Sequence, residues 1–176
     1  MLKPKKGRLL ISEPSMEDSN FFRSVILLAV HNKNESVGFV LNQPTKIKVH
    51  HLIENFPKSS FPIYIGGPVE RNSLHYVHTI GTKIEGSQKI LDGLYWGGDF
   101  EVVRKMVENN EVDSSNIRFF AKNNPTSIDV VCSAVGVLWQ SEVFIELQSF
   151  PTKMIYHFGG TTFFQNRIYH FNGTSF

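Results

Sequence analysis

Cysteine is almost absent from this chain. One residue, Cys132, occurs among 176, so no intramolecular disulfide can form and no zinc site with several cysteine ligands can be assembled. Such scarcity is typical of proteins in a reducing compartment, and we expect a cytoplasmic protein. Cys132 lies in the apolar stretch "DVVCSAVGV", which favours a small buried side chain over a reactive thiol.

Long hydrophobic runs are also missing. The run "VILLAV" over residues 25–30 is far shorter than the ~20 residues that cross a bilayer. The basic N-terminal stretch is followed only by "LLI", whereas a secretory signal needs an apolar region of ~7–15 residues. We therefore expect no contact with a membrane.

Charge of one sign is not in large excess. The formal net charge is +2, which is too small to indicate nucleic-acid binding by itself. The lysines near the N-terminus are typical of a solvated arm. No stretch has the pattern of a helix-turn-helix, so we expect no sequence-specific binding of nucleic acid.

The sequence does contain material for a sizeable core, since 41% of its residues are hydrophobic. Short runs rich in branched and aromatic residues predict strands. Between them, "VHHLIENF" (49–56) and "DFEVVRKMVENN" (99–110) predict helices, the second with an apolar stripe and Asp99 as its N-cap. We expect an α/β fold over residues 1–176: a single layered domain with a mixed, largely buried β-sheet and a few flanking helices. The predicted strands are "RLLIS", "SVILLAVH", "VGFVLN", "PIYIGG", "LHYVHTI", "GLYWGG" and "NIRFFA".

The seven histidines do not form a recognisable metal motif. His75 and His78 lie in a predicted strand, where positions three apart fall on opposite faces. No H-E-x-x-H pattern and no G-x-S-x-G elbow occurs. We expect no metal, no cofactor and no assigned catalytic residue.

Two glycine pairs invite a phosphate-loop hypothesis, which the flanking residues do not support. "IGGPVE" (65–70) has neither the Gly-Lys-Ser/Thr of a P-loop nor the G-x-G-x-x-G of a dinucleotide site. Pro68 lacks an N–H donor and Glu70 would repel an anion. In "WGGDF", Asp99 occupies the place at a helix N-terminus where an anion would bind. We interpret both pairs as turns at strand ends, where glycine lets the backbone pass another element closely.

Several of these segments together resemble one bacterial family. In order along the chain they are "GRLLISEPSMEDSNFFRSVILLAVH", "VGFVLNQP", "YIGGPVE", Val77-His78 and "LDGLYWGGDFEVV". Over residues 7–121 the chain resembles the AlgH/YqgE family. The resemblance implies an α/β domain with a mixed sheet of unusual topology. The family is mostly uncharacterised and has a provisional label of transcriptional regulator, so it implies no catalytic residues.

After residue 121 the resemblance ends and the composition changes. Residues 1–121 hold 28 charged side chains and residues 122–176 hold 6. The family normally continues with a Gly-Tyr-x-Gly-Trp segment, which is missing here. We expect the β-rich, Phe-rich tail to form hairpins around Gly159-Gly160. The abrupt change motivates the hypothesis that this tail follows a shifted reading frame.

Polar loops at strand ends are where α/β domains usually bind ligands. From the residues alone, an ordered loop with Arg23 paired to Glu17 or Asp18 is the simpler interpretation. If the loops share a cleft, the chain is a non-enzymatic regulatory or binding module for an unknown small molecule or protein. The alternative is a hydrolase or transferase in which Arg23 holds a small anionic substrate and His31 or His78 is the base. The candidate surface comprises Arg23, His31, Asn42, Pro44, Gly66, Gly67, His78 and Asp99.

Overall fold

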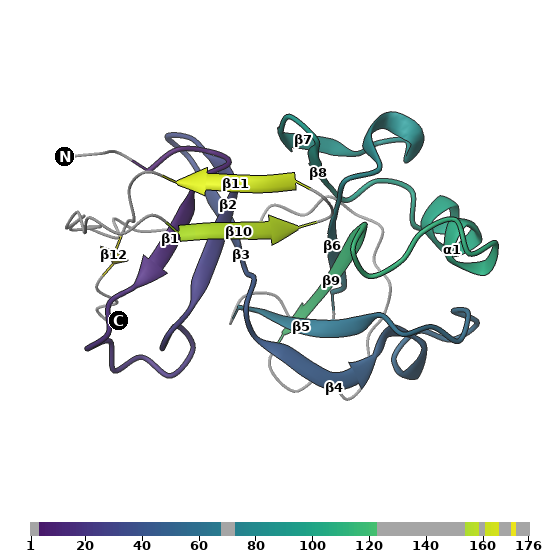
Figure 1. The fold of residues 1–176 in the computed structure, drawn as a ribbon, viewed down its shortest axis with the longest axis horizontal. Helices are drawn as coiled ribbons and strands as arrows, with labels where there is room; N and C mark the ends of the chain where they lie inside the picture. Colours follow the sequence, from purple (N-terminus) through teal and green to yellow (C-terminus); the bar gives the residue numbers. More distant parts are fainter. Residues whose placement is uncertain (1–3, 68–72, 123–153, 159–160, 166–169, 172–176) are drawn as a thin grey trace.

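The computed structural model describes residues 4–67, 73–122, 154–158, 161–165 and 170–171 (Figure 1). Within these residues the chain forms a four-stranded sheet, a six-stranded sheet, a separate two-stranded hairpin and one α-helix. The strands are β1 (Leu9–Ser12), β2 (Val25–His31), β3 (Ser36–Val40), β4 (Pro44–Lys48), β5 (Pro62–Gly67), β6 (His75–His78), β7 (Gln88–Leu91), β8 (Leu94–Trp96), β9 (Ile117–Lys122), β10 (Met154–Phe158), β11 (Thr161–Gln165) and β12 (His170–Phe171). The helices are η1 (Val49–His51), η2 (Gly81–Lys83) and α1 (Phe100–Glu108).

The four-stranded sheet has the order β12-β1-β2-β3. Its strand β2 is apolar on both faces, because both faces are covered. Leu27 packs into a core shared with the six-stranded sheet, whereas Leu28 packs into a second cluster with Met16 and Phe21 of the loop that precedes β2. The prediction that "SVILLAVH" contains a strand is confirmed.

The six-stranded sheet has the order β4-β5-β9-β6-β8-β7. Strand β9 runs parallel to β5 and antiparallel to β6, so the sheet is mixed, as predicted. Two strands of this sheet, β4 and β7, were not predicted. Both lie at its edges, where polar and charged residues weaken the apolar pattern of a strand.

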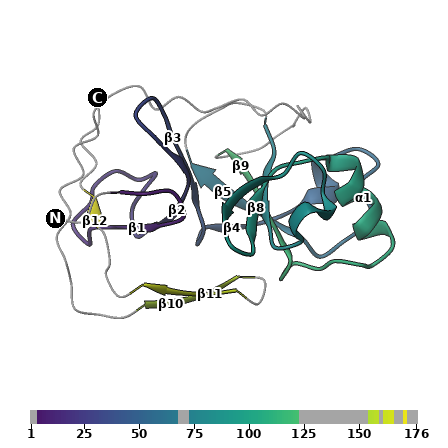
Figure 2. The ribbon, with the colours of Figure 1, turned by 90° about the horizontal axis from the view of Figure 1, so that it is seen from above.

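Strand β9 shows how the layers are stacked. Phe119 packs into the core beneath α1, while Phe120 packs into the core between the two sheets. The alternation of side chains along a strand places these neighbours on opposite faces. The order of layers is therefore α1, six-stranded sheet, four-stranded sheet, and α1 lies at the opposite end of the molecule from β1 and β2 (Figure 2).

The helical content is lower than predicted. The expected helix over residues 49–56 is wrong, because only the short 3-10 turn η1 forms there. Asn55 has a left-handed backbone (φ 60°) and Pro57 follows closely, both of which stop helical hydrogen bonding. The α1 prediction is confirmed: Asp99 caps the helix by accepting from the Glu101 N–H at 2.8 Å. The fold is mostly β, with a single α-helix in the described part of the chain.

In the tail, β10 and β11 pair antiparallel from Met154↔Gln165 to Phe158↔Thr161, which confirms the predicted hairpin. Strand β12 pairs in parallel with β1. Cys132 and the pair Gly159-Gly160 lie outside the described residues. In the described ranges, no helix is long and apolar enough to cross a membrane.

Candidate functional site

The site begins with a turn that leads into β2. Asn42, which follows β3, reaches across to this turn through both ends of its side-chain amide. Its Oδ1 accepts from the Val25 N–H at 2.9 Å, and its Nδ2 donates to the Arg23 carbonyl at 2.8 Å. These two bonds bracket the backbone on either side of Ser24, so the turn has a fixed shape.

Arg23 is held in an uncommon conformation by this bracket. Its φ is +50°, in the left-handed region that side chains other than glycine and asparagine rarely adopt. Its exposed guanidinium lies 5.1 Å from the ring centroid of Phe22, which is itself 46% exposed. The expected pairing of Arg23 with Glu17 or Asp18 does not form. Asp18 instead accepts from Asn20.

A buried hydrogen-bond network supports the turn from behind. Ser24 is completely buried, and its N–H donates to Ser12 Oγ at 2.8 Å. The Gln43 amide donates to Ser24 Oγ at 2.9 Å. Since buried polar groups need partners, these bonds explain why polar residues occupy the ends of three adjacent strands.

The same network continues into the six-stranded sheet. The Ile65 N–H donates to the Gln43 carbonyl at 2.9 Å, and Pro44 lies opposite Tyr64 in the β4–β5 pair. The Arg23–Asn42 turn and the end of β5 are thus connected by direct contacts. Asn42 contacts Arg23 directly, whereas Pro44 and the glycine pair are linked to the turn only through Gln43 and β5.

The two positions at the end of β5 require glycine for different physical reasons. A Cβ on Gly66 would lie 2.9 Å from Phe120 Cβ, so glycine is needed for close approach of β9, as predicted. Gly67 has φ +135° and open space around it, so its backbone conformation is what requires glycine. Residues 68–72, including Pro68 and Glu70, lie outside the described residues.

Arg118 is a site residue that the sequence reasoning missed. Its Nη1 donates to the Leu41 carbonyl at 3.2 Å, and its guanidinium lies 4.6 Å from the Tyr64 ring centroid. Desolvation by burial lowers the Arg118 pKa from its ordinary value, although a guanidinium remains charged at any physiological pH. A charged residue inside the alternating strand "IRFF" was the available signal.

His31 lies at the other end of β2 from Arg23. Its Nδ1 is 2.7 Å from Ser36 Oγ. The six residue steps from Val25 to His31 span roughly 20 Å at about 3.3 Å per residue. The structure therefore does not bring His31 to the Arg23 turn.

His78 is fully buried on the α1 side of the six-stranded sheet, next to Tyr76. Its Nε2 is 3.1 Å from the Gly97 carbonyl and 3.1 Å from Ser87 Oγ. Because a carbonyl can only accept, Nε2 of the neutral ring carries the proton and is not available as a base for Ser87. Desolvation lowers the His78 pKa, partly offset by the bond to Gly97. His75 points to the opposite face, toward Phe39, as predicted.

Asp99 and its preceding glycines form a structural turn. Gly98 packs so closely that a Cβ would lie 2.6 Å from Ile84 Cγ2, and its carbonyl accepts from Tyr76 OH at 2.7 Å. Asp99 is occupied by its capping bond to Glu101. These residues orient α1 and lie apart from the Arg23 turn.

The groups at the resulting candidate site are suited to binding a ligand or a protein partner. It offers an exposed guanidinium, an exposed aromatic ring and a rigid hydrogen-bonded turn. Across the part of the chain that the structure describes, no group of three or more His, Cys, Asp or Glu residues could hold a metal ion. Neither His31 nor His78 faces Arg23, so the described geometry gives no support to a base beside this guanidinium.

The layered mixed-sheet fold with polar strand ends defines a class of small, mostly β proteins with two packed sheets. The chain belongs to the AlgH-like family, whose model matches residues 9–123. Among its relatives, the UPF0301 protein of Chlorobaculum parvum is 40% identical over 116 residues, covering 66% of this chain and 62% of the relative. The UPF0301 protein of Parabacteroides distasonis is 39% identical over 119 residues, covering 66% and 60%.

Two solved structures share the fold. Protein DIP2367 of Corynebacterium diphtheriae matches with a TM-score of 0.56 and 25% identity, covering 69% of this chain and 65% of that protein. The AlgH protein of Pseudomonas aeruginosa matches with a TM-score of 0.54 and 21% identity, covering 70% of each. This chain spans about three fifths of the length of its curated relatives.

Proposed function

We propose that this chain is a non-enzymatic binding module that recognises a small molecule or protein partner through the turn at Phe22-Arg23. The observation that carries the proposal is the conformation of Arg23. A non-glycine residue with φ +50° costs free energy, yet Asn42 holds it there with two hydrogen bonds. The result is a guanidinium presented to solvent on a rigid support.

The chemistry of the turn favours a ligand with an anionic group beside an apolar part. Guanidinium groups bind carboxylates and phosphates through parallel hydrogen bonds, and an exposed ring such as Phe22 supplies an apolar contact. Arginine and aromatic residues are also enriched where protein partners bind. A regulatory role would then operate through the bound partner, in agreement with the absence of a recognition helix in the described elements.

The test separates binding from stability with the substitution Arg23→Gly. Glycine relaxes the left-handed strain, so we expect the variant to be as stable as the parent or more stable, by about 1 kcal/mol. A panel of carboxylate and phosphate metabolites would be screened by thermal shift. A ligand at 100 times its Kd stabilises the folded state by about 2.7 kcal/mol, and Arg23→Gly should abolish this gain.

The matched control is Asn110→Gly, because Asn110 also has a left-handed backbone (φ 57°) but lies after α1, away from the turn. It should keep the ligand-induced shift. For a protein partner, the parent and Arg23→Gly chains would be compared as baits in affinity capture. Equal responses from Arg23→Gly and the parent protein would contradict the proposal, as would the failure of every metabolite and every bait.

A further inference from the structure

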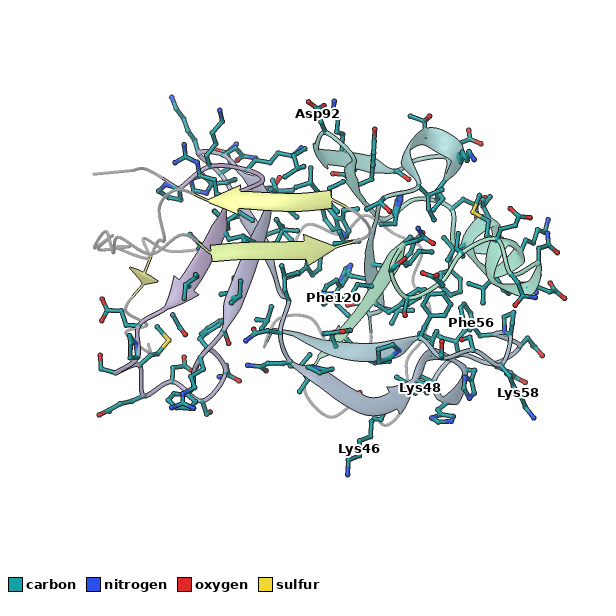
Figure 3. All side chains as sticks on the ribbon, viewed as in Figure 1. Lys46, Lys48, Phe56, Lys58, Asp92 and Phe120 are labelled. Atoms are coloured by element: carbon teal, nitrogen blue, oxygen red, sulfur yellow. The ribbon has the colours of Figure 1, made fainter. Side chains whose placement is uncertain are left out.

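A second surface lies along the edge strand β4, beyond Pro44, and on the segment that follows this strand. We name it the β4 rim, and it comprises Lys46, Lys48, His50, His51 and Lys58. Between residues 44 and 60 the charged residues are three lysines and one acid, Glu54. Figure 3 shows Lys46 and Lys58 on the lower side of the molecule, away from its centre.

Hydrogen bonds hold the parts of the rim together. Lys48 Nζ donates to the Ser60 carbonyl at 3.2 Å, which places the Lys48 ammonium within two residues of Lys58. The Ser59 N–H donates to His50 Nδ1 at 3.3 Å. The strand β4, the turn η1 and the segment 58–60 therefore present their cations on one connected surface.

An irregularity in β4 sets the position of Lys46. Pro44 pairs with Tyr64 and Lys48 pairs with Pro62, so β4 has two extra residues relative to β5. Thr45 fills the gap by donating from Oγ1 to the Ile63 carbonyl at 2.9 Å. Bulges at sheet edges redirect side chains. The Cα atoms of Lys46 and Lys48 are at most about 7 Å apart, since two residues can span no more.

The two histidines add donors to the same surface. His50 Nδ1 accepts from Ser59 and His51 Nδ1 accepts from the Lys48 N–H at 3.3 Å. Each neutral ring therefore carries its proton on Nε2, which is free to donate. The rings touch, with centroids 4.3 Å apart.

The cations of the rim are not neutralised within the described protein. None of its ion pairs involves Lys46, Lys48 or Lys58. Lysines on an edge strand also prevent edge-to-edge association, but that role requires neither Lys58 nor the histidines. Several cations without an ion pair along one edge suit an extended anion with repeated charges.

From this arrangement we propose that the β4 rim binds an anion that carries two or more phosphate groups in a row. A single phosphate would engage only part of the rim, whereas a chain of phosphates would contact the β4 and 58–60 segments together. The charge and the donors of the rim fit phosphate oxygens, which accept from both ammonium and imidazole N–H groups.

The test uses inorganic tripolyphosphate as the probe, measured by isothermal titration calorimetry on the full chain at low salt. We expect tripolyphosphate to bind at least tenfold more tightly than orthophosphate. The triple variant Lys46→Gln/Lys48→Gln/Lys58→Gln should weaken binding at least tenfold. The control variant Lys33→Gln/Lys83→Gln/Lys105→Gln changes the net charge equally and should stay within about threefold of the parent.

A further arm identifies the natural source of the phosphates. A short thymidine oligonucleotide that binds with the same dependence on the rim lysines would indicate a nucleic-acid backbone. Binding of tripolyphosphate without binding of the oligonucleotide would indicate a free polyphosphate or nucleoside polyphosphate. Either result supports the proposal that the rim binds consecutive phosphate groups.

The proposal is overturned if tripolyphosphate does not bind, or if both triple variants lose affinity equally, since net charge would then suffice. The proposal would also be overturned if the rim variant aggregates but keeps its affinity for tripolyphosphate. The rim lysines would then serve only to prevent edge-to-edge association. Arg23→Gly should leave tripolyphosphate binding unchanged. The proposal for the β4 rim and the proposal for the Arg23 turn can therefore be supported or contradicted independently of each other.

Discussion

At the scale of single residues, several polar side chains are explained by the groups with which they form hydrogen bonds. Asn42 holds the turn at Arg23, Ser24 receives the Gln43 amide, and Asp99 caps α1. His78 differs from these residues. Its Nδ1 is buried and has no hydrogen-bond partner in the described structure, so protonation of this ring inside the fold would create a charge that nothing there neutralises.

His78 should therefore make the protein less stable at mildly acidic pH. Burial lowers its pKa below the ordinary 6.5, so the unfolded chain binds more protons than the folded one below that pH. The stabilising contribution is present above pH 6.5 and is lost as the pH falls toward the folded pKa, with a slope of at most about 1.4 kcal/mol per pH unit.

The substitution His78→Gln tests this expectation, because a glutamine amide can still donate to the Gly97 carbonyl but does not titrate. Urea unfolding from pH 8 to pH 5 should show a shallower loss of stability in the variant than in the parent. Identical slopes in the two proteins would show that His78 is not the group responsible.

At the scale of elements, the turn at Gly97-Gly98 determines where α1 begins and how it lies on the sheet. The Asp99 N–H donates to the Glu85 carbonyl at 2.8 Å, and the Gly97 N–H donates to the Tyr76 carbonyl at 3.0 Å. The turn thus ties the residue that caps α1 to the loop after η2 and to strand β6. Its two glycines are not equivalent, which permits a paired test.

Gly98→Ala should destabilise the fold by roughly 3–5 kcal/mol. Its φ is +111° and a Cβ would lie 2.8 Å from the Glu85 carbonyl oxygen, so backbone strain and overpacking add. Gly97→Ala is the control, because its φ is +67° and its Cβ would meet nothing within 4 Å. It should cost only about 1–2 kcal/mol. Equal losses in chemical denaturation would contradict the assignment of Gly98 as the packing position.

Helices and strands are predictable from the sequence where the hydrophobic pattern and the capping or turn residues indicate the same element. Asp99 before an apolar stripe predicted α1, and strand β5 was predicted at its observed bounds. The edge strand β4 was not, since Pro44 resembles a turn residue and two lysines hide the alternation. The sequence predicts that Arg23 and Asn42 lie in polar loops at strand ends, but it does not predict the contact between them. Its geometry depends on β2 and β3 pairing, which the residues 23–42 do not specify locally.

The inclusion of His31, His78 and Asp99 in the candidate surface shows the limit of this reasoning. A signature shared with a family does not distinguish a residue that binds a ligand from one that shapes the fold. His78 binds the Gly97 carbonyl of the turn before α1, and Asp99 caps the helix, so their structural roles account for both residues. The sequence does not place Arg118 at the site, because the contact of its guanidinium with Leu41 spans 77 residues.

At the scale of the whole molecule, the two cores meet at β9. Phe119 and Phe120 are both almost completely buried, each in a different core. Loss of either ring should therefore weaken both layers. We predict that Phe119→Ala and Phe120→Ala each cost roughly 3–5 kcal/mol.

Both variants should also unfold in one transition, with tryptophan fluorescence and far-ultraviolet circular dichroism giving the same midpoint. This result would confirm the prediction of a single domain. Two separated transitions, with one core lost first, would show that the sheets fold as independent units.

The tail presents a different kind of prediction. The family match ends at residue 123, close to the point where charged residues become scarce. We predict that resequencing the coding DNA reveals a one- or two-base slip near codon 122, with a Gly-Tyr-x-Gly-Trp segment in the alternative frame. An intact frame would show that this protein has a tail of its own.

The position of β9 also affects the order in which the protein can be built. β5 and β6 follow each other in sequence but do not pair, because β9 is inserted between them. Ile63 pairs with Phe119 across 56 residues. During translation at about 5–20 residues per second, the β4–β5 pair leaves the ribosome several seconds before its partner strand exists. Until residue 122 emerges, the nascent chain exposes two unpaired strand edges, and this interval is when it most needs a chaperone.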